Sequence, residues 1–269
     1  MLWADQLRIL AFSDVVKWWG VFEALVDQLN PDVITLAGDL AFDGFAPFYW
    51  TGALSDEIPK GKNFERLRRM HVNRFYRFLT YAGRKSKVLM VRGNHDDEFK
   101  GGYLPQKINR IPGCVEVSGK IIELNGYRFL GLGYNDAHDS RKLKQMSERL
   151  TGKVDIVLMH GENIRLVSLL KPKLIIKGGL KLGACLVNDV PSVFTGPEHY
   201  AIIELRNKTV SKISGYLFNS SNWDTYLGPG IWLKPGEMRE VPLNVPWNYG
   251  WVKPLRLPDL AHREIREEP

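Results

Sequence analysis

The chain contains a series of short apolar runs, and several of them end in a polar residue of a type that can bind metal ions. Several runs are continuous stretches of Val, Ile and Leu, which is typical of β-strands covered on both faces. Segments with helical periodicity lie between them, and this alternation predicts a layered α/β domain. The expected strands are residues 7–12, 32–37, 87–91, 120–124, 127–132, 154–159, 173–176 and 200–205, and the expected helices are residues 18–29, 63–82, 140–150 and 162–170.

Four of the polar residues stand where an expected strand stops and a loop begins: Asp14, Asp39, Asn94 and His160. The carboxyl ends of neighbouring strands in an α/β sheet face one crevice, so these side chains are expected to meet there. Carboxylate and amide oxygens combined with an imidazole nitrogen suit Mn, Fe or Zn. Each residue alone has an ordinary interpretation, because an Asp after a strand is commonly a turn former and a single His is commonly structural. The combination predicts a metal-binding crevice.

Bulk properties indicate a globular protein of 269 residues, with 44% hydrophobic and 25% charged residues. The sequence contains no apolar run of the length that a membrane helix needs, so no membrane partner is expected. Its two cysteines are too few for a disulfide framework, which favours a reducing, cytoplasmic location.

The order of the motifs resembles the calcineurin-like metallophosphoesterase family. The resemblance rests on Asp14 after the first strand, Gly38-Asp39 after the second, the run 93–96 (Gly-Asn-His-Asp) after the third, and a later His160. It covers about residues 7–205, and 93–96 is its most specific part. The resemblance implies a four-layer α-β-β-α sandwich of two mixed sheets and hydrolysis of phosphate esters at two metal ions.

Carried over to this chain, the resemblance assigns Asp14 to the first metal and Asp39 to the bridge between the metals. Asn94 and His160 would bind the second metal. His95 would lie beside the substrate and assist the leaving group. Asp96 would orient His95, because a carboxylate can fix the tautomer of an imidazole. His95 and Asp96 are therefore the expected catalytic residues.

Three ligand positions of the family pattern hold residues that cannot replace a histidine. Val16 stands in the first motif, and Gly179 and Lys181 stand in the last one. The first site would then keep two carboxylates, while the second keeps Asp39, Asn94 and His160. The expected cofactor is one divalent ion (Mn, Fe or Zn) at the second site, or none. The Lys181 ammonium is expected to replace the ion of the first site.

The positive charge of the chain is concentrated in one segment. Residues 60–92 hold eleven Lys or Arg and one acid, whereas the whole chain carries +7. On the expected helix 63–82, apolar residues share one side and cations the other. Unrelieved like charge predicts an anionic partner, either RNA, DNA or a ribonucleoprotein, and a solvated helix face is the alternative. The expected contact residues are Lys62, Arg66, Arg69, Arg74 and Arg77.

The composition changes near residue 216. The last 54 residues hold four of the eight Trp and seven of the fifteen Pro residues, a spacing that excludes a long helix. We therefore expect a metallophosphoesterase-like domain over 1–215, with a basic helical insertion at about 44–86, and an aromatic, Pro-rich C-terminal arm or appendage over 216–269. The arm could also contact a protein complex.

Three functions follow from these patterns. The loss of ligands favours a protein that no longer performs dinuclear catalysis and serves as a binding or scaffold module for nucleic acid, a ribonucleoprotein or a protein complex. The retained run 94–96 favours a phosphoesterase with an altered or mononuclear metal site, acting on a phosphodiester or nucleotide. A binder of small phosphates that does not cleave them is the third. Whether the chain is an enzyme stays open at this point.

Overall fold

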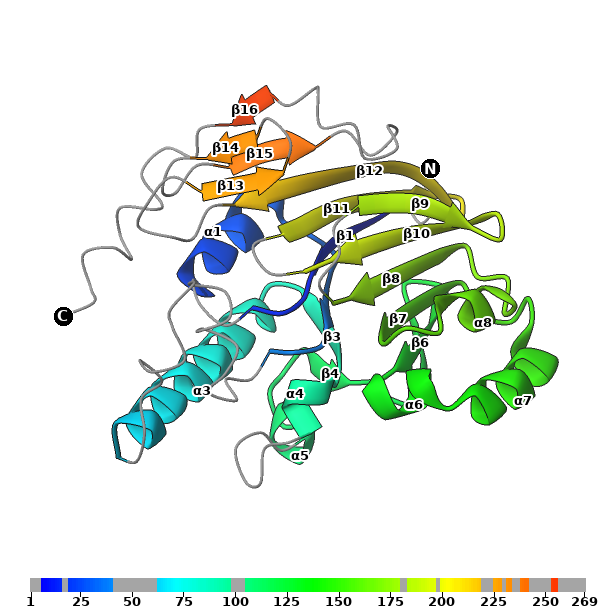
Figure 1. Cartoon of the computed structure of the whole chain (residues 1–269), viewed down its shortest axis with the longest axis horizontal. Coiled ribbons are helices and arrows are strands. Elements are labelled where there is room, and N and C mark those ends of the chain that lie inside the picture. Colours follow the sequence, from blue (N-terminus) through cyan, green and yellow to red (C-terminus); the bar gives the residue numbers. More distant parts are fainter. Residues whose placement is uncertain are drawn as a thin grey trace.

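A computed structural model describes residues 6–15, 19–40, 62–97, 105–179, 183–196 and 199–218, together with four short strands between 225 and 255. Side chains at 62–68, 71, 95, 97, 105–106, 199 and beyond 216, except 240, are outside this description. The arrangement of the elements is shown in Figure 1.

The first sheet has eight strands in the order β16-β15-β12-β11-β1-β2-β3-β4, with both parallel and antiparallel pairs. Its centre is parallel: β1 pairs with β2 and β2 with β3, while β11 runs antiparallel to β1. The strands are β1 (Gln6–Phe12), β2 (Val33–Ala37), β3 (Lys87–Val91), β4 (Cys114–Glu116), β11 (His199–Arg206), β12 (Thr209–Phe218), β15 (Met238–Val241) and β16 (Lys253–Leu255).

The second sheet has six strands, in the order β5-β6-β7-β8-β10-β9, with β6, β7, β8 and β10 parallel and β5 and β9 antiparallel at its edges. Its strands are β5 (Ile121–Leu124), β6 (Tyr127–Leu132), β7 (Ile156–His160), β8 (Leu174–Gly178), β9 (Gly183–Val187) and β10 (Val190–Thr195). A separate hairpin joins β13 (Thr225–Gly228) to β14 (Ile231–Leu233).

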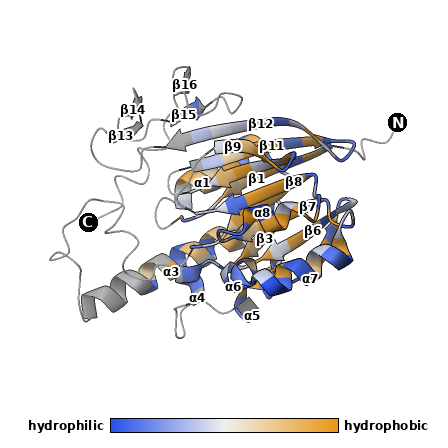
Figure 2. Cartoon of the chain, turned by 45° about the vertical axis from the view of Figure 1, so that its right-hand side comes forward, coloured by the Kyte–Doolittle hydropathy of each residue, from blue (hydrophilic) through white to orange (hydrophobic). Residues whose placement is uncertain are grey.

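Three apolar cores define four layers. One lies between the sheets and includes Ile9, Leu158 and Ile176. Another lies between the first sheet and the helices α1 (Trp19–Leu29) and α3 (Lys62–Ala82). The third lies between the second sheet and the helices α6 (Tyr134–His138), α7 (Ser140–Leu150) and α8 (Ile164–Ser168). In Figure 2 the strands at the centre are largely apolar, whereas α7 carries many polar residues.

Alternation along each strand explains this layering. In β1, Leu7, Ile9 and Ala11 face the core between the sheets, while Leu10 and Phe12 face α1 and α3. Phe12 stacks on Phe22 of α1, with 4.3 Å between the ring centroids. Both faces of the central strands are therefore buried, which is why their sequences are almost continuously apolar.

The predicted four-layer sandwich of two mixed sheets is confirmed. Helices α7 and α3 begin within one residue of their predicted positions and end as predicted. The remaining short helices are α4 (Asn94–Asp97) and α5 (Pro105–Ile108). Beyond residue 215, β12 continues to Phe218 and pairs with β15, so this part of the predicted arm extends the first sheet. No helix in the described part of the chain has the length and apolar character that crossing a membrane requires.

Candidate metal centre

Both sheets contribute to the candidate site at the carboxyl ends of their parallel strands. Asp14 follows β1, Asp39 follows β2, and Asn94 follows β3 as the first residue of α4. His160 is the last residue of β7 in the second sheet. Because these strands end at the same edge of the sandwich, their terminal side chains reach one another across the boundary between the sheets.

His160 is the centre of this group. Its ring is buried, and Nδ1 lies 2.7 Å from the carbonyl oxygen of Ala37. Its Nε2 lies 3.2 Å from Oδ2 of Asp39 and 3.2 Å from Oδ1 of Asn94. The bond at Nδ1 orients the ring so that Nε2 faces the two oxygens, which is the arrangement that second-shell contacts give to metal-binding histidines.

The distances from His160 Nε2 to the two oxygens suit a shared metal ion. Donors bound 2.0–2.2 Å from an ion at tetrahedral or octahedral angles lie about 3.0–3.5 Å apart. The two distances from Nε2 fall within this range. The described residues hold no group of three or more His, Cys, Asp or Glu side chains that could bind a metal, so an ion here would take the Asn94 amide as its third protein donor.

The neighbouring carboxylates change the protonation of His160. Burial alone would lower its pKa, but the contact with Asp39 and the charges of Asp39 and Asp14 raise the pKa to about 9. The metal-free ring is therefore a cation that neutralises Asp39. Binding of a metal ion at Nε2 would replace that proton, because a metal ligand must present a free lone pair.

Asp14 lies beside this group with a different set of partners. Its Oδ2 lies 2.6 Å from Ser13 Oγ and accepts a hydrogen bond from the backbone N–H of Gly179 at 3.1 Å. Burial and, to a smaller extent, the charge of Asp39 raise the pKa of Asp14 to about 7, against the lowering effect of His160. Asp14 and Asp39 both have positive φ, at 56° and 53°, a conformation that is uncommon outside glycine and that clusters at functional sites.

Two glycines allow backbone segments to approach each other closely at the site. A Cβ on Gly93 would lie 1.9 Å from Asp39 Oδ1. A Cβ on Gly178 would lie 1.8 Å from the carbonyl oxygen of Ala37, across the boundary between the sheets. Glycine at both positions therefore allows Asp39 and His160 to reach each other.

The Asp96 carboxylate fixes two of the site loops to each other. Its Oδ2 accepts hydrogen bonds from the backbone N–H groups of Asp39 at 2.8 Å and Gly93 at 2.7 Å, and its Oδ1 accepts one from Leu40 at 2.9 Å. Asp96 is 3% exposed. Its described contacts thus hold the loop after β2 against the loop after β3. The side chain of His95 lies outside the described residues, so its catalytic role and its orientation by Asp96 stay predictions.

The expected gaps in the ligand set are described only in part. Gly179 offers Asp14 a backbone N–H where the family pattern has an imidazole. Val16 and Lys181 lie outside the described residues, and the predicted replacement of an ion by Lys181 stays untested. Apart from His160, whose Nε2 faces Asp39 and Asn94, no described side chain beside Asp14 offers a nitrogen atom that could bind a metal ion together with its carboxylate.

Sequence reasoning missed the partners that position the site. Ser13 acts through its side-chain hydroxyl, whereas the carbonyl of Ala37 and Gly178 act through close approach of the backbone, and no motif spacing reveals either kind of contact. It also gave no individual role to Lys177, whose side chain is buried on β8. The conspicuous position of a Lys within the apolar run LIIKG was the available signal.

The predicted basic residues lie on α3. Arg69 and Arg77 are exposed and Arg74 is half-buried, while the side chains of Lys62 and Arg66 lie outside the described residues. The charge of Arg77 acts on Glu23 of α1 and partly offsets the rise that burial causes in the pKa of that carboxyl.

Comparison with known proteins agrees with the geometry. Residues 7–201 match the family described as calcineurin-like phosphoesterase. TT1561 of Thermus thermophilus is similar in structure, with a TM-score of 0.52 and 17% identity, over 77% of this chain and 97% of its own. Another solved structure has a TM-score of 0.53 and 12% identity, over 77% of this chain and 98% of its own. These likenesses concern the fold.

No curated protein matches the chain. The family match spans the whole second sheet and strands β1, β2, β3 and β4 of the first, and the four residues predicted to lie at the strand ends fall inside it. The chain belongs to the calcineurin-like phosphoesterase family.

Proposed function

We propose that this chain is a phosphoesterase with a mononuclear metal site, which binds one divalent ion through Asp39, Asn94 and His160 and acts on a phosphodiester or nucleotide. The observation that supports it is the convergence of Asp39 and Asn94 on Nε2 of a ring whose other nitrogen is held by Ala37. A bound ion of this kind would supply positive charge for a phosphoryl oxygen and lower the pKa of a bound water.

The residues of the chain have separate tasks in this proposal. His160, Asn94 and Asp39 would hold the ion, and the Asp39 carboxylate would offset part of its positive charge. Asp14, bound to Ser13 and Gly179, stays close enough to influence the charge of His160. His95, at the start of α4 beside Asn94, is the candidate acid for the leaving group. The donors described around Asp14 do not complete a second ion site, so standard dinuclear catalysis is not proposed.

Metal stoichiometry tests this proposal. Protein loaded with Mn²⁺ or Zn²⁺ and then desalted should retain about one ion per chain, because three protein donors converge at only one described point. His160→Ala should lose at least tenfold in metal affinity, as expected for removal of a direct ligand. The measurement is metal content by mass spectrometry, with hydrolysis of bis-p-nitrophenyl phosphate under added Mn²⁺ as the activity readout.

The control is His138→Ala, which removes an exposed histidine of α6 that lies near the site but is not one of the three proposed donors, and it should keep the metal content of the unchanged protein. Two tightly held ions per chain would overturn the mononuclear proposal. One ion without hydrolysis would leave a metal-binding, non-hydrolytic member of the family and would favour the scaffold function.

Binding to RNA or DNA is a second candidate function, because Arg69 and Arg77 are exposed on α3. The double change Arg69→Gln and Arg77→Gln should reduce the slope of log K against log salt by about 0.7 for each lost phosphate contact with a single strand. Fluorescence anisotropy with a single-stranded oligonucleotide at several KCl concentrations measures this slope. The matched control removes two exposed arginines of α7, Arg141 and Arg149. Equal slopes in both double variants would exclude α3 as the contact surface.

A further inference from the structure

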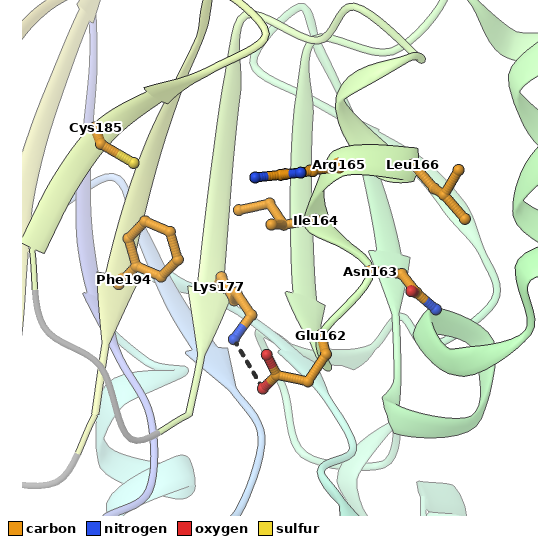
Figure 3. A pocket seen from close by; sticks show the side chains of 8 residues that line it. All are labelled: Glu162, Asn163, Ile164, Arg165, Leu166, Lys177, Cys185 and Phe194. Atoms are coloured by element: carbon orange, nitrogen blue, oxygen red, sulfur yellow. Dashed lines mark hydrogen bonds and ion pairs between the residues drawn. The ribbon is translucent and has the colours of Figure 1, made fainter.

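A cavity of about 420 Å³ opens on the outer face of the second sheet, between α8 and strands β8, β9 and β10. This volume falls within the range of sites for small organic ligands. Lys177 lies on the same face of β8 as Ile175, which belongs to the core under the helices, whereas Ile176 faces the first sheet. The cavity and His160 are therefore on opposite sides of the sheet. The lining consists of Glu162, Asn163, Ile164, Arg165, Leu166, Lys177, Cys185 and Phe194 (Figure 3).

Lys177 is the unusual member of this lining. Its side chain is only 4% exposed, yet its Nζ lies 3.5 Å from Oε1 of Glu162 and 3.4 Å from the carbonyl oxygen of Gly178. Both distances are long for hydrogen bonds of an ammonium group, and Glu162 is 74% exposed. Burial of a charged group that has only weak hydrogen bonds costs free energy. An anion in the cavity could therefore form a stronger hydrogen bond with the Lys177 ammonium than its present partners do.

The other walls indicate what should accompany the anion. The Phe194 ring lies 5.8 Å from Lys177 Nζ, and Ile164 adds an apolar surface beside it. In Figure 3 the guanidinium of Arg165 extends across the cavity toward Cys185. Lys177 and Arg165 together provide two positive charges, which suit a phosphate dianion, and the exposed Glu162 can turn toward solvent. The volume exceeds what a bare phosphate would fill.

We propose that this cavity binds a small aromatic phosphate, with the ring against Phe194 and Ile164 and the phosphate between Lys177 and Arg165. None of the lining residues is a proposed metal ligand, so the inference stands apart from the proposed function. Ring stacking and charge-assisted hydrogen bonds would both contribute to binding.

Cys185 provides a reporter for occupancy. The chain has two cysteines. Cys114 is buried and its pKa is raised to about 12, so it reacts slowly with alkylating agents. Cys185 is exposed and lines the cavity. Its alkylation rate should therefore fall when a ligand fills the cavity.

The experiment follows the alkylation of Cys185 by iodoacetamide in metal-free protein, with phenyl phosphate as the probe. Without the ion, the carboxylates near His160 do not favour an anion there. Phenyl phosphate should slow alkylation in a saturable manner, and inorganic phosphate or phenol should need about tenfold higher concentrations. No protection by phenyl phosphate, or equal protection by inorganic phosphate, would overturn the proposal.

Variants separate the cavity from general effects of the probe. Lys177→Met keeps the approximate length and the apolar stem of the side chain but removes the charge. It should raise the concentration of phenyl phosphate that gives half-maximal protection about tenfold. Arg165→Gln changes an exposed residue and gives a second readout if Lys177→Met does not fold. Lys173→Met, which removes an exposed lysine just before β8, should leave protection unchanged. Protection that is unaffected by loss of Lys177 or Arg165 would contradict the assignment.

Discussion

Replacement of Asp96 by alanine is expected to lower the free energy of unfolding by about 4 kcal/mol, because three backbone N–H groups lose their acceptor at once. These donors belong to Asp39, Leu40 and Gly93, and the carboxylate that serves them is buried. Each unsatisfied buried donor costs about 1–3 kcal/mol. Urea denaturation followed by circular dichroism measures the change.

The matched control is Asp139→Ala. Asp139 is exposed and accepts one backbone N–H, from Lys142 at the start of α7. Loss of a helix cap of this kind costs about 1 kcal/mol. If Asp96→Ala costs no more than Asp139→Ala, the role of Asp96 as the anchor of the two loops is wrong. A smaller loss in Asp96→Asn is expected, since an amide keeps one acceptor oxygen.

Asp14→Asn is expected to stabilise the metal-free protein at pH 8 while leaving it nearly unchanged at pH 4. The folded-state pKa of Asp14, about 7, is above its ordinary value of 3.8 because of burial and the charge of Asp39. A carboxyl with a raised pKa stabilises the fold below its unfolded pKa, and this contribution is lost as the pH rises through the folded pKa. The loss amounts to at most about 4 kcal/mol between pH 4 and pH 8.

Asparagine should fit the position well. It tolerates the positive φ of 56°, and its carbonyl oxygen can accept from Ser13 and Gly179 as the carboxylate does. The measurement is the free energy of unfolding in EDTA at pH 4, 6 and 8, with the surface change Asp139→Asn as the control. A pH-independent difference between Asp14→Asn and the unchanged protein would contradict the assigned shift.

The positions of the site residues could be predicted because strand ends are visible in the sequence. Asp14, Asp39 and Asn94 each follow a continuous apolar run, and the parallel order of β1, β2 and β3 brings these runs to one edge. The meeting of Asn94 with His160 required the second sheet to pack on the first. The resemblance supplied that packing, and periodicity alone could not, because it carries no information on which sheets face each other.

The edges of the sheets were harder to predict. Strands β9 and β10 follow the degenerate last motif. Strand β9, with the sequence GACLV, lies half-exposed at the edge of its sheet, so burial of both faces does not mark it as a strand. The C-terminal strands β13, β14, β15 and β16 are only three or four residues long. Short edge strands depend on pairing with a neighbour rather than on their own sequence.

Lys177 shows a different limit. The sequence places it two residues before Gly179, among four lysines near the last motif. Whether such a lysine points to solvent or into the protein depends on which face of β8 is covered, and α8 covers that face. Here the pairing order of the strands, and not the residue type, decides the role of the side chain.

The hydrogen bond between His160 and Ala37 joins a strand of each sheet at their common edge. An ion bound to Nε2, Asp39 and Asn94 would therefore link the two sheets. Its binding free energy would add to the free energy of unfolding of the whole domain. Heat would then separate the two sheets later and in a single step in the loaded protein, so that the melting curve itself would report the ligand.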